Sequence, residues 1–429
     1  MTATTILAVK GRRVWDSRGR PTVEAEVRLA GGAVGRAIAP AGASTGSGEA
    51  IELRDGGPRL GGRDVQQAVA AVNGEIARAL AGRDAAEQGP LDRLLVDLDG
   101  TPQKRRLGGN SLVAVSMAAL HAAAAATAKP VYEHLLGDAA EAGLPLPEIQ
   151  IFGGGAHAAR RVDIQDFMVV APAAECFGQA LEWTAEIYRA AGEAMAAAGL
   201  LHGVADEGGF WPEFETNEAA LDALTAAIER AGFTPGEEVS ISLDIAASEF
   251  HRDGRYRLAR EGRDFDSDAM IEMLLGWLDR YPIASIEDPL AEDDPDGLRR
   301  FTAAAGHRVQ IVGDDFLVTQ AARVRAAAAA GICNAVLVKP NQAGTVSEAK
   351  AALDAARQAG WGAIASARSG ETEDVTIVHL AVGWGVRQLK VGSFARSERM
   401  AKWNEALRIE EALGSRARFA GKTAFERRD

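Results

Sequence analysis

Alternating apolar and polar residues open the chain and predict β-strands. The alternation is clearest in "PTVEAEVRLA" (21–30) and "AVGRAIAP" (33–40), which lead into the Gly/Ser/Thr-rich loop "AGASTGSGEA" (41–50). Helical spacing of apolar residues follows in residues 64–82 and 111–130. Strands first and helices after are typical of an α+β domain.

Beyond residue 147 the pattern changes to short apolar strands that alternate with long Ala-rich helices. The predicted strands lie in "VSISLDIAAS", "ASIEDPLAED", "VQIVGDDFLV", "AVLVKPNQAG", "GAIASARSGE" and "RQLKVGSFAR". Each strand ends in charged residues and continues into a loop, as in a (β/α)₈ barrel with its active site at the carboxyl ends of the strands. Periodicity alone does not separate this fold from an open α/β sheet. The Pro- and Gly-containing stretch 130–147 marks a boundary, which predicts domains at 1–135 and 140–429.

Composition and charge narrow the function classes. The chain has 429 residues, 47% of them hydrophobic, and a net charge of −13, which argues against a nucleic-acid or anionic-membrane surface. The N-terminus shows no export signal, and residues 111–130 are too weakly apolar for a membrane span, so we expect a packed helix there. Cys176 and Cys333 lack metal or disulfide spacing. We therefore expect a cytoplasmic enzyme of small metabolites.

Acidic residues end three successive predicted strands: Asp244, Glu287 and Asp314. A lone acidic residue at a strand end is more often a helix cap. Three carboxylates that converge without basic partners would repel one another, so a divalent cation of the Mg²⁺ type explains the set better. The sequence therefore predicts a metal site.

Lysines end two further strands, at Lys339 and Lys390. Burial disfavours a charged ammonium, so we expect a lowered pKa and a usable base. The alternative is that both lysines merely neutralise the carboxylates. Proton abstraction beside a metal-bound carboxylate explains the whole set, since a metal stabilises the resulting enolate.

At this point the chain resembles the enolase family. The matching blocks run in order from about residue 14 to 414: "DSRGRPTVEAEV", "AGASTGSGEAIELRDGG", "GGGAHAARRVDIQDFM", "ADEGGFWPEF", "SLDIAASEF", "SIEDPLAEDD", "VGDDFLVTQ", "VKPNQAGT", "SARSGETED" and "LKVGSFARSERMAKWNEALRIEEALG". The resemblance implies an N-terminal α+β capping domain, a modified (β/α)₈ TIM barrel and a homodimer or octamer. It also implies two Mg²⁺ ions per active site and chemistry on 2-phosphoglycerate or phosphoenolpyruvate.

The resemblance also implies residue roles. Asp244, Glu287 and Asp314 match ligands of the first Mg²⁺, and Ser44 matches a mobile-loop ligand of the second. Lys339 matches the general base, Lys390 a lysine that helps bind the substrate carboxylate, and Glu207 the acid that assists departure of the β-hydroxyl. The matches for substrate binding are Arg368, Ser369, His157 and Gln165.

Several residues depart from the family pattern. Enolases have "SHRSGETED" where this chain has "SARSGETED", so Ala367 replaces a histidine that enters the pocket. Asp166 replaces a catalytic glutamate, and Arg160 and Arg161 replace two asparagines in the second mobile loop. Further differences are the "GGG" at 153–155, Ala41 and Pro340.

These departures favour an altered substrate. Guanidinium groups bind carboxylate and phosphonate well. The space left where Ala367 replaces the histidine, together with the two new arginines, therefore suits a bulkier, more anionic phosphorus group. The chain thus resembles a divergent paralogue of enolase, of the kind expected for a carboxyphosphonoenolpyruvate synthase of phosphinothricin-type antibiotic pathways. The alternatives are a housekeeping enolase with drifted residues and a non-catalytic relative used for binding. Arg160 and Arg161 are also compatible with solvated surface charge.

Overall fold

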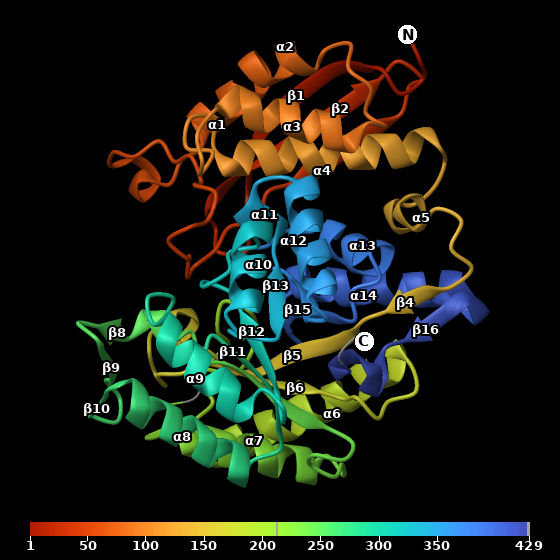
Figure 1. Ribbon diagram of the computed structural model, residues 1–429. Coiled ribbons are helices and arrows are strands. Elements are labelled where there is room, and N and C mark those ends of the chain that lie inside the picture. Colours follow the sequence, from red (N-terminus) through yellow and green to blue (C-terminus); the bar gives the residue numbers. More distant parts are fainter. Residues whose placement is uncertain (212, 427–429) are drawn as a thin grey trace.

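The computed structural model describes residues 1–211 and 213–426, and it contains a small N-terminal domain above a larger barrel (Figure 1). The small domain begins with an antiparallel sheet of β1 (Ile6–Trp15), β2 (Pro21–Leu29) and β3 (Val34–Ile38), in that order. Its helices are α1 (Gln66–Ala71), α2 (Ala77–Leu80), α3 (Gln88–Asp99) and α4 (Gly109–Ala126), with α5 (Val131–Leu136) after them. The predicted order of strands first and helices after is confirmed.

Helix α4 packs across β2 and β3 and forms the core of the small domain. A Cβ on Gly35 of β3 would lie 2.1 Å from the backbone nitrogen of Ala122, so only glycine allows this close approach. The 18-residue helix has a mean hydropathy of 1.3 and passes a length-and-composition test for a membrane span, yet 83% of it is buried inside the protein. Packing within the domain accounts for its apolar character.

The barrel is a closed sheet in the order β11-β12-β13-β14-β15-β5-β6-β7. Its strands are β5 (Leu146–Gly153), β6 (Asp166–Val170), β7 (Ser240–Asp244), β11 (Ile283–Glu287), β12 (Gln310–Gly313), β13 (Ala335–Val338), β14 (Gly362–Ser366) and β15 (Gln388–Ser393). The predicted TIM-type barrel with an N-terminal α+β domain is confirmed, whereas the bounds 1–135 and 140–429 stay a prediction.

Strand β6 runs antiparallel to both of its neighbours, while the other adjacent pairs are parallel. Asp166, the first residue of β6, pairs with Asp244, the last residue of β7. Because β6 is reversed, its beginning lies at the edge where the other strands end. This reversal brings Asp166 to the mouth of the barrel.

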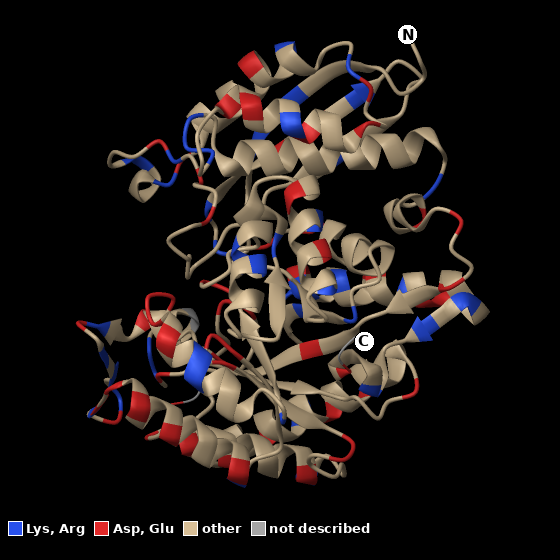
Figure 2. Ribbon diagram, viewed as in Figure 1, with Lys and Arg blue, Asp and Glu red and all other residues tan. Residues whose placement is uncertain are grey.

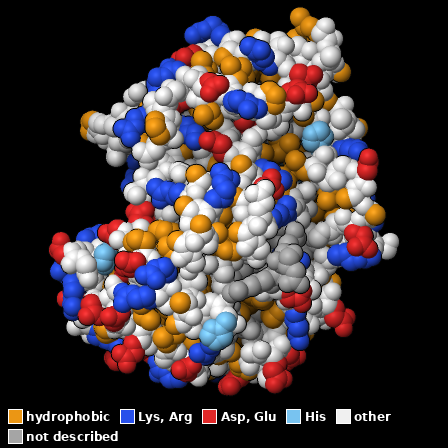
Figure 3. All heavy atoms as spheres, viewed as in Figure 1, with side chains coloured by type: hydrophobic (Ala, Val, Ile, Leu, Met, Phe, Trp, Pro, Cys, Tyr) orange, Lys and Arg blue, Asp and Glu red, His pale blue; other side chains and the backbone are white. Residues whose placement is uncertain are grey.

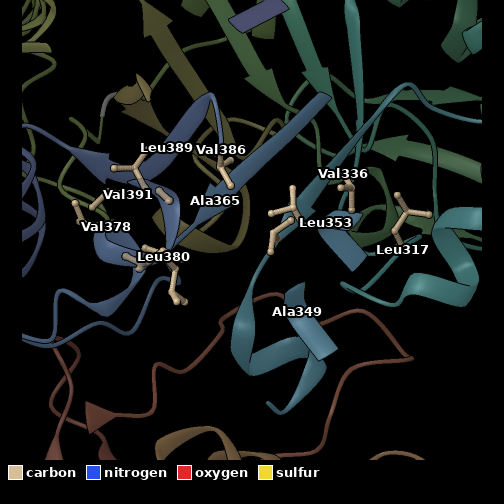
Figure 4. Close-up of a cluster of buried hydrophobic side chains, with 14 of the residues drawn as sticks. Leu317, Val336, Ala349, Leu353, Ala365, Val378, Leu380, Val386, Leu389 and Val391 are labelled. Carbon is tan, nitrogen blue, oxygen red and sulfur yellow. The ribbon is translucent and has the colours of Figure 1, made fainter. Parts of the chain in front are cut away.

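Helices surround the barrel and bury the outer faces of its strands. They are α6 (Phe177–Ala197), α7 (Asn217–Arg230), α8 (Ser267–Arg280), α9 (Pro295–Ala305), α10 (Ala321–Ala329), α11 (Pro340–Ala343), α12 (Val346–Gln358), α13 (Thr376–Gly383) and α14 (Ser397–Leu413). Figure 4 shows Leu353 of α12, Leu380 of α13 and Leu389 of β15 within this layer. Burial of such side chains, worth about 1.5–3 kcal/mol each, makes the barrel a rigid support for its loops.

Short strands complete the fold. Strands β4 (Ala142–Leu144) and β16 (Ala417–Phe419) pair in parallel, and β8 (His251–Arg252), β9 (Arg255–Leu258) and β10 (Arg263–Phe265) form a small sheet after β7. Charged residues of both signs are distributed along the outer helices and loops (Figure 2). On the face drawn in Figure 3, Lys and Arg side chains alternate with Asp and Glu side chains.

Candidate active site

A small polar cavity of about 20 Å³ lies at the carboxyl ends of the barrel strands. Among the predicted site residues, its lining includes Ser44, Gln165, Asp166, Glu207, Asp244, Lys339, Arg368, Ser369 and Lys390. Ala43, Ser366, Ala367 and Val391 complete the lining. Residues that are more than 300 positions apart in the sequence therefore meet in one cavity.

The two lysines are ion-paired with the predicted metal carboxylates. Lys390 Nζ lies 2.9 Å from Asp244 Oδ2 and 2.8 Å from Glu287 Oε2, and Lys339 Nζ lies 2.5 Å from Asp314 Oδ2. All five side chains are buried. Opposite charges at this spacing offset much of the cost of removing each charge from water.

The expectation of lowered lysine pKa values is wrong for this arrangement. Burial alone would lower the pKa of Lys390, but attraction to Asp244 and Glu287 raises it well above its ordinary value. For Lys339, burial is likewise outweighed by Asp314, which raises the pKa. Both lysines are charged here, as the alternative that they neutralise the carboxylates predicts.

The carboxylates themselves show strong mutual influence. Burial raises the pKa of Glu287 well above its ordinary value, and repulsion from Asp244 raises it further. Burial acts in the same direction on Asp314, but attraction to Lys339 and Arg368 lowers its pKa overall. Glu287 Oε1 is buried and has no hydrogen-bond partner among the described residues.

These features fit a divalent cation. Three buried carboxylates at neighbouring strand ends form an oxygen donor set of the kind that Mg²⁺ prefers, and Glu287 Oε1 offers an unused lone pair. The most compact acidic group is different: Asp288, Asp314 and Asp315 each place one oxygen within 4.8 Å of the others. However, the carboxylate of Asp288 already accepts from the amides of Asp314 and Asp315, at 2.9 and 2.8 Å. Asp244, Glu287 and Asp314 stay the predicted ligands, and Asp288, Asp314 and Asp315 are a second candidate set.

Arg368 and Ser369 bring a guanidinium and a hydroxyl group to the wall of the cavity. Arg368 Nη1 donates to Glu49 Oε2 at 3.0 Å, and Nη2 donates to Ser44 O at 2.9 Å. Burial alone would lower the pKa of Arg368, but Glu49 raises it, so the guanidinium is charged. The buried Arg399 of α14 donates to the backbone oxygens of Arg368 and Ser369, both at 2.6 Å, and thus holds this segment in place.

The N-terminal domain contributes the Ser44 loop. Backbone bonds join Ala41 and Gly370 in both directions, at 2.9 and 2.8 Å, and anchor the start of the loop to the segment after Ser369. Arg18 donates to Ala41 O at 2.9 Å and to Gly42 O at 3.2 Å. These bonds place Ser44 at the cavity, as a role in substrate or metal binding requires.

Gln165, Asp166 and Glu207 line the opposite side. Gln165 Nε2 donates to Asp244 Oδ2 at 3.0 Å, and Asp166 Oδ2 lies 3.6 Å from Lys390 Nζ. Glu207 is buried on the turn after Ala205, and its backbone oxygen accepts from Ser393 N at 2.8 Å. Asp166 therefore lies near the charged lysine, and attraction to Glu207 also raises the pKa of Lys390.

The remaining predicted residues lie elsewhere. The lining does not include Arg160 or Arg161; Arg160 pairs with Glu249 at 3.2 Å and Arg161 with Glu213 at 3.1 Å. His157 lies in the 3₁₀ turn Gly155–Ala158, and its side chain is outside the described part of the structure. The lining does not include Glu287 or Asp314 either, although both pair with lysines that do line the cavity.

Several supporting residues were not identified from the sequence. Glu49, Arg18, Arg399, Gln342 and Asp288 bind the predicted residues directly; for example, Gln342 Nε2 donates to Asp314 Oδ1 at 2.9 Å. All five lie inside the blocks quoted above, so their position beside predicted residues was an available signal. Their contacts depend on long-range packing that spacing does not show.

The comparison with protein families agrees with this geometry. A family described as "Enolase, N-terminal domain" matches residues 6–135, and one described as "Enolase, C-terminal TIM barrel domain" matches residues 141–428. The fold and the site define a barrel enzyme with a lyase-type active site. The chain belongs to the enolase family and is an enolase-superfamily enzyme for phosphoenolpyruvate-like substrates.

Proposed function

We propose that this enzyme uses Mg²⁺ and acts on an analogue of 2-phosphoglycerate or phosphoenolpyruvate with a bulkier, more anionic phosphorus group. The reaction would be proton abstraction next to a carboxylate followed by β-elimination, as in a carboxyphosphonoenolpyruvate synthase of phosphonate biosynthesis. A cytoplasmic location and a homodimer or octamer belong to the same proposal.

The single observation that carries the proposal is the position of Ala367. Its methyl group lines the cavity between the anion-binding Arg368 and the strand that carries Lys390. An imidazole at this position would fill part of the cavity and could hydrogen-bond an anion, whereas a methyl leaves room. The extra room lies beside the guanidinium and hydroxyl groups that suit a phosphorus group.

The chain's own residues have these proposed roles. Arg368 and Ser369 bind the phosphorus group, and Ser44 and Gln165 help to enclose the substrate. Lys390 binds the substrate carboxylate, and Lys339 removes the proton beside it. Glu207 protonates the departing β-group, and Asp166 faces Lys390 from the far side.

Asp244, Glu287 and Asp314 would hold one Mg²⁺, and Ser44 would contribute to the second. The chemistry that Mg²⁺ supplies when bound is neutralisation of the carboxylates that now raise the lysine pKa values, together with stabilisation of negative charge on the substrate. Lys339 would then be less strongly paired, and its burial would favour the neutral amine that a base requires.

Arg160 and Arg161 remain candidates for substrate binding. Their guanidinium groups are partly exposed and paired with Glu249 and Glu213, so a substrate role requires them to exchange these partners. Exposed pairs of this kind contribute about 0–1 kcal/mol, and such an exchange is therefore inexpensive.

A housekeeping enolase is the second candidate, since Lys339, Lys390 and Glu207 all line the cavity. A spectrophotometric assay with Mg²⁺ and 2-phosphoglycerate separates the two, performed on the unmutated protein and on Ala367→His. We expect turnover at least about a hundredfold below an ordinary enolase, partial recovery in Ala367→His, and tighter binding of phosphonoformate by the unmutated protein. Ordinary turnover without phosphonoformate binding would establish the housekeeping function. No turnover and no binding of either compound would favour the non-catalytic relative.

A further inference from the structure

Gln150 is a fully buried side chain of β5 that contacts two sides of the cavity without lining it. Its Nε2 donates a short hydrogen bond to Asp166 Oδ1, and its Oε1 accepts from Gly209 N at 2.8 Å. An amide N–H can only donate, so the bond from Gly209 fixes which end of the amide is oxygen. The NH₂ group must therefore face Asp166.

The Gly209 end of this bridge holds the turn that carries Glu207. Ala205 N donates to Gly209 O at 2.8 Å, and Gly208 N donates to Ala205 O at 3.0 Å, which closes a tight turn around Glu207. A Cβ on Gly209 would lie 2.5 Å from Gln150 Oε1, so only glycine permits this contact. The amide of Gln150 thus sets where the turn ends.

The Asp166 end holds a carboxylate on the reversed strand. With Oδ1 bonded to Gln150, the other oxygen, Oδ2, lies 3.6 Å from Lys390 Nζ. One uncharged side chain therefore connects Asp166 on β6 with the turn of Glu207. Both of its bonds are buried, and loss of a buried partner is costly because the remaining group stays unsatisfied.

We propose that Gln150 is a positioning residue that sets the placement of Asp166 and Glu207 relative to one another during catalysis. This inference rests on the proposed function for the roles of the two carboxylates. It adds that one amide sets the spacing of the two carboxylates. Substitution of this amide should therefore lower kcat more than it changes KM.

The test compares Gln150→Met, which removes both bonds, with Gln150→Glu, which keeps an acceptor for Gly209 but replaces the donor to Asp166. Gln310→Met is the matched control, because Gln310 is a buried barrel glutamine that donates to Gln388 at 2.7 Å, away from the cavity. Steady-state kinetics are measured with 2-phosphoglycerate and the preferred phosphonate analogue. Hydrogen exchange is followed in peptides that cover residues 205–211.

For Gln150→Met we expect kcat to fall about a hundredfold, with KM changed less than about threefold, since a positional error near 1 Å costs about this much in rate. Exchange in residues 205–211 should become at least about tenfold faster. Gln150→Glu should lose a similar amount of kcat but keep slow exchange, and Gln310→Met should keep both kcat and exchange. Gln150→Asn, which keeps the amide on a shorter side chain, substitutes for a variant that does not fold.

The inference is overturned if Gln150→Met retains kcat and slow exchange as Gln310→Met does, which would make Gln150 a core residue only. A change in KM with kcat unchanged would also overturn it. If the unmutated protein turns over neither substrate, the proposed function fails, and the exchange comparison still decides whether Gln150 holds the turn of Glu207.

Discussion

The barrel interior contains two successive layers of buried polar side chains, and the side chains of each layer are stabilised in a different way. The upper layer, which we call the charged layer, contains Asp244, Glu287, Asp314, Lys339 and Lys390. The lower layer, which we call the amide layer, contains Glu148, Ser285, Gln310 and Gln388. Gln388 precedes Lys390 by two residues on β15, and Ser285 precedes Glu287 by two on β11, so each pair shares the inner face.

Hydrogen bonds from amide and hydroxyl groups join the amide layer. Gln310 Nε2 donates to Gln388 Oε1 at 2.7 Å, Ser285 Oγ donates to Gln310 Oε1 at 3.0 Å, and Gln388 Nε2 donates to Glu148 Oε1 at 2.7 Å. Amides that pair with one another need no counter-charge, whereas each charge above requires a partner of opposite sign. Charge is therefore concentrated in the layer that meets the substrate.

The largest expected effect comes from breaking the charged layer. Lys339→Met removes the proposed base and leaves Asp314 without its 2.5 Å ion pair. We expect kcat to fall roughly 10²–10⁴-fold, the usual contribution of a general base. Steady-state kinetics on the preferred substrate check this.

Lys350→Met is the control, because Lys350 lies on the outer helix α12 and pairs with Asp354 on the same helix, at 2.6 Å. Its kcat should equal that of the unmutated protein. Comparable activity in Lys339→Met and Lys350→Met would show that Lys339 is only a counter-ion.

The next effect concerns the one carboxyl group of the amide layer. Burial raises the pKa of Glu148 from its ordinary value of 4.5 to about 7. The folded protein thus binds this proton more tightly than the unfolded chain, so the group favours folding least above pH 7. Glu148→Gln should therefore increase the free energy of unfolding at pH 8 by about 3 kcal/mol more than at pH 4.5.

Urea unfolding at the two pH values measures this difference. Glu411→Gln, on the exposed surface of α14, is the matched control and should show no such pH dependence. An equal effect of Glu148→Gln at both pH values would mean that Glu148 stays ionised beneath Lys390.

Addition of Mg²⁺ tests which carboxylates hold the metal ion. At a concentration a hundred times the Kd, bound Mg²⁺ should stabilise the fold by about 2.7 kcal/mol. Glu287→Gln should abolish this gain. Asp315→Asn should keep it, because Asp315 lies outside the ligand set of Asp244, Glu287 and Asp314. Thermal unfolding with and without Mg²⁺ tests both variants, and the reverse pattern would assign the ion to Asp288, Asp314 and Asp315.

The smallest effect on stability is expected outside both layers. The double substitution of Arg160 and Arg161 by alanine removes two partly exposed pairs and should change the free energy of unfolding by less than about 1 kcal/mol. If the loop closes on substrate, KM for the phosphonate analogue should rise while kcat stays near its original value. An unchanged KM would confine both arginines to the surface.

Much of the charged layer was predictable, because strand ends are visible in the sequence. A short apolar run followed by Asp244, Glu287 or Lys339 indicates both the strand and the place where it ends. The sequence pattern identified six barrel strands but not β5 or β6. Strand β5 ends in Gly153 and β6 carries Asp166 at its beginning, so neither shows an apolar run that ends in a charged residue. The amide layer was missed because its hydrogen bonds join residues of different strands, which spacing along the chain does not show.

The amino-acid sequence alone was enough to predict the alternation of strands and helices in the barrel, the order of strands and helices in the N-terminal domain, the family, and the set of acidic and basic strand ends. Each of these depends on local pattern or on motifs of contiguous residues. Which charges face one another depends on the tertiary structure, and these contacts make the lysine pKa values rise rather than fall. The tertiary structure also decided that β6 runs in reverse, that Arg160 and Arg161 pair outside the cavity, and that Gln150 joins Asp166 to the turn of Glu207. Electrostatic and hydrogen-bond partners depend on distance in space, and spacing along the chain does not specify that distance.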